Sequence, residues 1–204
     1  MAPRSAAALV ALALAGLGVT ACTTTSQVHP EYVSAGLAAP VMQGKAVIVM
    51  DAAARNGTVT AHPTSLTGAA TSITEPMGPI IAATGEKVFG AGFSGGAQVA
   101  DHPQPDAYAV ALRSDSFSFK YDQLSNLGFA ITPKVSVGVT ADVAAPGGKP
   151  LLHKSYTRTD ITTGAYAASL NPPEKINQAL HMALGEIFRE VLDDIKAAAG
   201  KGAP

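Results

Sequence analysis

A serine between glycines is the first candidate nucleophile in this chain. The segment 92–96 reads Gly-Phe-Ser-Gly-Gly and fits Gly-x-Ser-x-Gly, the nucleophile elbow of serine hydrolases. An acid and a base follow in the required order, namely Asp142 and then His153 or His181. The elbow requires a strand, a turn and a helix in succession, and the flanking residues do not predict them. We therefore expect a glycine-rich connector here, and we keep a hydrolase that uses Ser94 as the enzymatic alternative.

Two other kinds of chemistry have weaker support. Residues 90–95 fit Gly-x-Gly-x-x-Gly, but a dinucleotide site needs a strand before the glycines and a helix after them. Here a helix is expected before them. The histidines stand at positions 29, 62, 102, 153 and 181, and none is paired with another at the i, i+4 spacing of a helical metal site. We predict no catalytic residue, no cofactor-binding residue and no metal ligand.

The single cysteine, Cys22, carries the clearest chemical signal. Arg4 is followed by an apolar run from Ala6 to Val19, and the chain becomes polar directly after Cys22. A basic start, an apolar stretch and small residues before a cleavage point are typical of an export signal. The run Val19-Thr20-Ala21-Cys22 resembles the lipobox of bacterial lipoproteins. That resemblance implies a diacylglyceryl group on the Cys22 sulfur, cleavage between Ala21 and Cys22, and acylation of the new amino terminus.

Two alternatives remain for this segment. A retained transmembrane helix needs about 20 residues to cross a bilayer core, and the apolar run has 14. An ordinary signal peptide would be cut after Ala21 without lipidation. Against this second alternative, a free thiol in an exported protein is unusual, and the only cysteine stands where lipidation requires it.

Composition excludes some partners. After removal of residues 1–21 the chain keeps 183 residues with 15 acids and 13 bases, so its net charge is −2. A block of Lys and Arg is missing, and with it the electrostatic footprint of a nucleic-acid-binding protein. A chain of this length can bury a sizeable core. Because no further cysteine follows, its stability must come from packing and not from an internal disulfide.

The chain divides into four expected regions. Residues 1–21 form the lipoprotein signal peptide, and 22–43 form a flexible tether without helical or strand periodicity. Residues 44–199 form a single periplasmic α+β domain, and 200–204 form a tail. Within the domain, the threonine-rich stretch 58–75 shows no period that would assign it to a helix or a strand.

The middle of the domain predicts strands. Residues 46–50 are continuously apolar, as in a strand buried on both faces. Apolar residues alternate over 108–112, and again over 117–121 after an offset that favours a bulge. The cleanest alternation, over 135–143, precedes Pro-Gly-Gly-Lys-Pro at 146–150 and predicts a hairpin with residues 151–158.

Two helices and a set of small residues complete the expectation. Residues 79–89 predict a short helix. Pro172 to Ala198 predict a long one, whose apolar stripe is Ile176, Leu180, Leu184, Ile187, Val191 and Ile195. Small residues accompany the strands, namely Ala107, Ala109, Ala111, Gly138 and Ala141. We expect a helix packed on them; the alternative is an acyl chain lying close to the sheet.

This order of parts resembles outer-membrane lipoproteins of the YajG type and the auxiliary lipoproteins of ABC-type lipid transport. The shared parts are the lipobox, the first buried strand, a helix, a hairpin-rich middle and a final helix that begins Lys175-Ile176-Asn177-Gln178. The resemblance implies an α+β fold, a mostly antiparallel sheet packed by the two helices, and no catalytic residues. Thr23 after Cys22, in place of Asp, implies the outer membrane by resemblance to the bacterial sorting rule.

The expected function is therefore that of a non-catalytic accessory lipoprotein of the cell envelope. It would be anchored in the outer membrane through lipidated (palmitate-bearing) Cys22 and would face the periplasm. It would bind an envelope protein complex or a lipid-transport partner, with a lipid as a further ligand and without a cofactor. The alternatives are an activator of a cell-wall enzyme and the Ser94 hydrolase.

Overall fold

Five strands form the larger of two sheets. The computed structural model describes residues 23–34, 36–66, 68–122, 131–164 and 172–201. The strands lie in the order β5-β2-β6-β7-β8. Their bounds are Ala97–Ala100, Ala46–Val49, Tyr108–Asp122, Thr132–Ala144 and Pro150–Ile161.

The sheet is mixed. Strand β2 runs parallel to both β5 and β6, whereas β6, β7 and β8 form two long antiparallel ladders. The predicted hairpin is the β7–β8 connection, where Gly147 and Gly148 both have φ of +83°, a left-handed conformation that suits glycine. The predicted offset in β6 is also present, as a register shift between Ser114 and Ser116.

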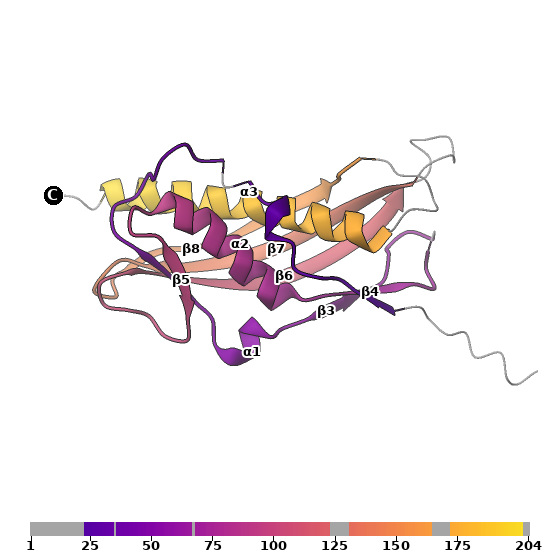
Figure 1. Cartoon of the computed structure of the whole chain (residues 1–204), viewed down its shortest axis with the longest axis horizontal. Coiled ribbons are helices and arrows are strands. Elements are labelled where there is room, and N and C mark those ends of the chain that lie inside the picture. Colours follow the sequence, from indigo (N-terminus) through magenta and orange to yellow (C-terminus); the bar gives the residue numbers. More distant parts are fainter. Residues whose placement is uncertain (1–22, 35, 67, 123–130, 165–171, 202–204) are drawn as a thin grey trace, which may run out of the picture.

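Two helices cover one face of this sheet, as Figure 1 shows. Helix α2 spans Met77–Gly92 and helix α3 spans Pro172–Lys201. All six residues of the predicted α3 stripe are fully buried. The two helices also pack on each other, with the rings of Phe89 and Phe188 stacked at 5.7 Å. The α+β prediction is confirmed, although α3 continues through Gly200 and Lys201, where the sequence predicts a tail.

A smaller sheet lies at one end of the molecule. Its strands β1 (Thr23–Thr25), β4 (Ser72–Glu75) and β3 (Val59–Ala61) lie in the order β1-β4-β3. Strand β1 is parallel to β4, and β3 is antiparallel to it. The stretch 58–75 thus contains two strands joined by a loop. A short helix, α1 (Ala52–Arg55), leads from β2 toward this sheet.

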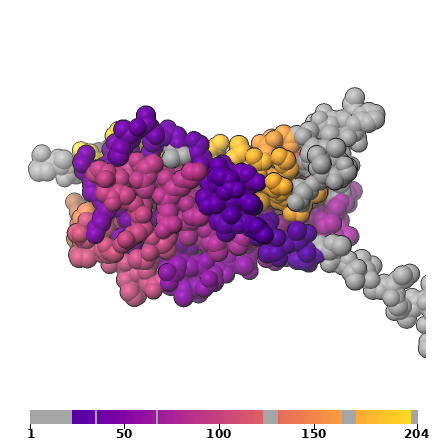
Figure 2. Space-filling view, in the orientation of Figure 1, coloured from indigo at the N-terminus to yellow at the C-terminus, as the bar shows by residue number. Residues whose placement is uncertain are grey.

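The expected flexible tether is corrected by the structure. Residues 23–25 pair with β4, and a turn of 3₁₀ helix follows at Pro30–Tyr32. Val33 and Met42 keep only 2% and 7% of their exposure. Figure 2 shows this N-terminal segment, in indigo, lying on the surface of the domain. Because its backbone and apolar side chains are used in packing, it cannot act as a free spacer.

Contacts with α3 hold the same segment in place. The backbone N–H of His29 donates to Nε2 of His181 at 3.1 Å, and Nη1 of Arg189 donates to the carbonyl of Ser34 at 2.7 Å. The hydroxyl of Tyr32 donates to Glu174 at 3.1 Å. The first and last parts of the described chain therefore form one packed unit.

The predicted signal peptide, with Ala21 and Cys22, lies outside the described residues. In the described part of the chain, no helix combines the length and the apolar character needed to cross a membrane.

Candidate functional site

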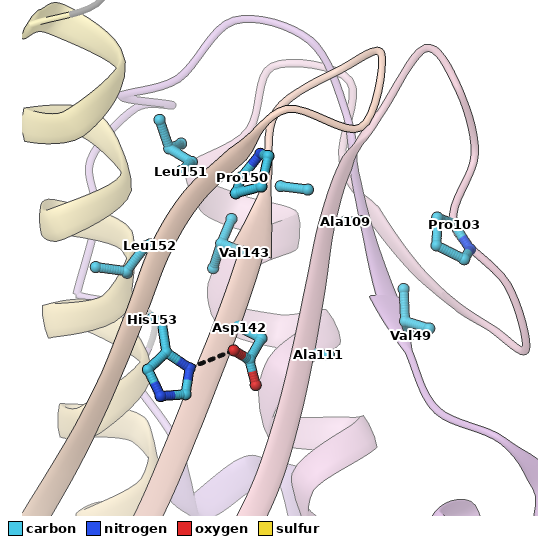
Figure 3. Close-up of a pocket in the computed structure, with 11 residues that line it drawn as sticks. Val49, Pro103, Ala109, Ala111, Asp142, Val143, Pro150, Leu151, Leu152 and His153 are labelled. Atoms are coloured by element: carbon cyan, nitrogen blue, oxygen red, sulfur yellow. Dashed lines mark hydrogen bonds and ion pairs between the residues drawn. The ribbon is translucent and has the colours of Figure 1, made fainter.

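The face of the large sheet opposite the helices carries an apolar groove. The groove has a volume of about 560 Å³ (Figure 3). It is crossed by a row of residues that face one another on four strands. Val49 on β2 and Ala111 on β6 form the floor, and Asp142 on β7 and His153 on β8 form one rim. Pro103 and Leu151 contribute to its walls. In the described part of the chain, no helix packs on this face.

The groove forms because large side chains alternate with alanines along β6. Tyr108, Val110 and Leu112 of β6 point toward the helices, so Ala109 and Ala111 point to the outer face. Alanine side chains leave open space there. The helix expected on the small residues therefore covers only part of them. Ala141 is buried beside its pairing partner Leu112 on the helix side, whereas Ala109 and Ala111 are only half-buried and line the groove.

A neighbouring loop extends the groove toward the β7–β8 turn. A second hollow, of about 390 Å³, shares Pro103, Ala109 and Ala144 with the first. The N–H of Gly147 donates to the carbonyl of Pro105 at 2.8 Å, which fixes the turn to the loop that follows β5. The apolar surface is thus continuous from the middle of the sheet to this end.

One rim of the groove is polar. Asp142 and His153 are joined by a hydrogen bond between a carboxylate oxygen and Nδ1, and their side chains remain 52% and 74% exposed. Along the strands, the hydroxyl of Thr140 donates to Asp115 at 2.5 Å and lies 2.6 Å from the hydroxyl of Ser155. The outer face is therefore apolar at the groove and polar beyond it.

The predicted hydrolase residues do not assemble. Ser94 is exposed, and its hydroxyl donates to Gln43 and accepts from the backbone N–H of Gly44, both at 3.2 Å. Gly44 precedes β2, which is three strands from β8, or roughly 14 Å across the sheet. The structure brings Asp142 to His153 but leaves Ser94 away from both. The motif also follows α2 and precedes β5, the reverse of a nucleophile elbow.

His181 has a packing role. Its ring is fully buried, and burial, followed by the nearby His29, lowers its pKa to about 4. Because Nε2 accepts from the N–H of His29, we place the proton on Nδ1, which lies 3.4 Å from the hydroxyl of Thr84. The neutral imidazole therefore links α2, α3 and the N-terminal segment.

Glu75, at the end of β4, is a buried acid that sequence reasoning missed. Its carboxylate accepts from the Ser26 hydroxyl and from Nδ2 of Asn177, both at 2.8 Å. Burial is the main cause that raises its pKa, and the two hydrogen bonds oppose this. The partners come from segments 49 and 102 residues away, so no local pattern could have revealed the cluster. Among the described residues, no three His, Cys, Asp or Glu side chains gather as a metal site.

The fold has relatives among solved structures. Protein XCC0632 from Xanthomonas campestris, of the family model DUF330, is similar with a TM-score of 0.50 and 12% identity, over 89% of this chain and 99% of that chain. The two proteins share an α+β fold. A minor lipoprotein from Acinetobacter baumannii gives a TM-score of 0.32 and 12% identity over 78% and 94% of the two chains, a similarity too low to establish a common fold. No protein-family model matches the chain, and comparison with curated proteins gives no significant match.

Proposed function

We propose that this protein is a non-catalytic accessory lipoprotein of the bacterial cell envelope whose groove binds an apolar segment of a protein partner. The groove supports the binding function, because apolar surface lies open on the outer sheet face while the helices close the core on the other. The proposed anchor is lipidated Cys22, in the outer membrane and facing the periplasm.

The position of the groove agrees with such a role. Strand β6 runs from the groove at Ala109 to Phe119, whose carbonyl accepts from the N–H of Thr64 near the small sheet. Ala109 and Phe119 are ten residues apart along the strand, a distance of roughly 33 Å. Thr23 lies in the small sheet, and the β7–β8 turn lies beside the hollow that continues the groove; these two parts lie toward opposite ends of the long axis (Figure 1). The domain itself, instead of a flexible tether, would then hold the groove away from the bilayer.

The chemistry of the groove indicates its ligand. Alanine and proline side chains on a shallow surface admit close approach by apolar side chains, and burial of such surface contributes about 25 cal/mol per Å². The Asp142–His153 pair at the rim offers both a hydrogen-bond acceptor and a donor. A protein segment with apolar side chains and a polar edge satisfies both parts.

Position-specific photo-crosslinking in cells tests the proposal. A crosslinking amino acid at Leu151, in the groove wall, should capture a defined envelope protein. The same amino acid at Thr157, exposed on the outer face of β8 away from the groove, should not. Ala111→Glu should abolish the crosslink from Leu151, because it places a charge on the groove floor. The matched substitution Thr157→Glu should leave the crosslink intact.

Each alternative has its own outcome. A cell-wall enzyme as the captured protein would favour the activator function, and a component of lipid transport would favour the auxiliary function. Co-purification of a lipid that Ala111→Glu removes would assign the groove to an acyl chain. Equal crosslinking from Leu151 and Thr157 would refute the groove as the binding site.

A further inference from the structure

The loop between β3 and β4 has an unusual exposed side chain at its tip. Leu66 is 98% exposed; the only other large apolar side chain exposed in the described chain, Met182, is at 36%. Single exposed leucines are common on protein surfaces. The significance of Leu66 therefore depends on where the loop lies and how it is held.

The loop is fastened on both sides of Leu66. Before it, the N–H of Thr64 donates to the carbonyl of Phe119 at 2.8 Å, and Ser65 accepts from the N–H of Tyr121 at 2.9 Å. After it, the N–H of Ala69 donates back to the carbonyl of Leu66 at 3.4 Å. The first two bonds attach the loop to β6 and the third closes a turn within the loop, so the leucine projects from a supported turn.

The parallel pairing of β1 and β4 places the loop at the same end of the small sheet as the residue that precedes Thr23. Thr23 pairs with Ser72, and Thr25 with Thr74. Because β1 and β4 run in the same direction, the residues before Thr23 and those before Ser72 leave the sheet at the same end of these two strands. Cys22 precedes Thr23 directly, and Leu66 precedes Ser72 by six residues. A lipid group on Cys22 would thus emerge at the end of the small sheet that carries the β3–β4 loop.

The residues at this end of the small sheet are also suited to contact with lipid headgroups. Between His62 and Glu75 the chain contains no charged residue, and Thr23, Thr24 and Thr25 are uncharged as well. These two segments therefore bring no charge that would lose its hydration at the membrane. The charged side chains of the adjoining strands are paired, Lys134 with Asp122 and Lys120 with Asp160. The leucine side chain supplies apolar surface that water does not favour.

We propose that the β3–β4 loop is a second membrane contact, in which Leu66 inserts at the interface of the bilayer that holds the Cys22 anchor. This proposal rests on the proposed lipid anchor. The anchor alone fixes one point and leaves the domain free to tilt. Leu66 adds a second point, so that the long axis of the domain stands away from the bilayer.

A depth measurement on the full lipidated protein tests the contact. Because Cys22 carries the lipid, Ala70→Cys provides a single free thiol on the exposed loop, with Leu66 kept. A polarity-sensitive NBD label is attached there, and the protein is reconstituted in vesicles of phosphatidylethanolamine and phosphatidylglycerol with nitroxide-labelled lipid. The control label is at Lys149→Cys, in the exposed β7–β8 turn.

The expected result is emission that shifts to the blue and is strongly quenched by the nitroxide for the Ala70 label, with neither effect for the Lys149 label. Adding Leu66→Glu should return the Ala70 label to its emission in water while the protein still floats with the vesicles. A floating protein whose Ala70 label stays unquenched, or whose two labels are quenched equally, overturns the loop contact and leaves the anchor intact. A protein that does not float overturns the anchor, and the loop contact with it.

Discussion

The buried imidazole of His181 should make the stability of the domain depend on pH. Its pKa falls from the ordinary value of 6.5 to about 4 in the folded protein. Between these values the unfolded chain binds a proton that the folded chain does not. The neutral imidazole therefore contributes fully to the free energy of unfolding above pH 6.5, its pKa in the unfolded chain. This contribution is lost as the pH falls toward about 4, its pKa in the folded protein. Going from about pH 7.5 to about pH 4 should remove about 3 kcal/mol from the free energy of unfolding.

The substitution His181→Gln isolates this effect. Glutamine is neutral at every pH, and its side-chain oxygen can accept from the N–H of His29 in place of Nε2. Glu75 contributes with the opposite sign, because its raised pKa favours the folded state when protonated, but its contribution is common to both proteins and cancels in the difference. The other ionisable groups near His181, namely His29, Glu31 and Lys87, are unchanged in the variant.

Urea unfolding of the chain from residue 23 onward measures this difference. Wild type and His181→Gln are compared at several pH values between about 4 and 7.5, with the exposed His102→Gln as the matched control. As the pH falls over this range, the free energy of unfolding should decrease by about 3 kcal/mol more for wild type than for His181→Gln. If the two proteins lose stability in parallel, the imidazole does not hold the N-terminal segment in its neutral form, and our account of this cluster is wrong.

Three further predictions concern single residues. Gly78→Ala should destabilise the domain by about 1–3 kcal/mol in the same assay, because its Cβ would lie 2.0 Å from the carbonyl oxygen of Ala54; wild-type stability would contradict this contact. Labelled palmitate should enter the protein in cells, and Cys22→Ser should abolish the labelling; labelling that persists would exclude Cys22 as the acceptor. Ser94→Ala should leave any ester hydrolysis by purified protein unchanged, and a loss would restore the hydrolase alternative.

Local periodicity predicted the elements that bury one face over a long stretch. The stripe of α3 extends over 20 residues and the alternation in β7 over nine, so the core face was evident before the structure. The bulge in β6 was likewise visible as a change of phase. These features depend on residues close together in the chain.

The small sheet was missed because it depends on distant residues. Thr23–Thr25 forms a strand only by pairing with Ser72–Thr74, and composition alone suggested a loop. Threonine is β-branched and suits a strand once a partner exists. The groove was missed for a related reason. Alternation shows that Ala109 and Ala111 share a face, but only the fold shows that the helices lie on the other one.

The contacts that fix the N-terminal segment also determine when it can fold. His29 meets His181 across 152 residues, and Ser34 meets Arg189 across 155. A chain that is delivered from its amino terminus therefore has no docking surface for this segment until α3 has arrived, and closing so long a loop is slow. Under the proposed lipid anchor, the undocked segment that begins at Thr23 would leave Cys22 open to the modifying enzyme during that interval. Processing of the terminus would then precede the completion of α3, and the last helix would close the fold beside an end that already carries its lipid.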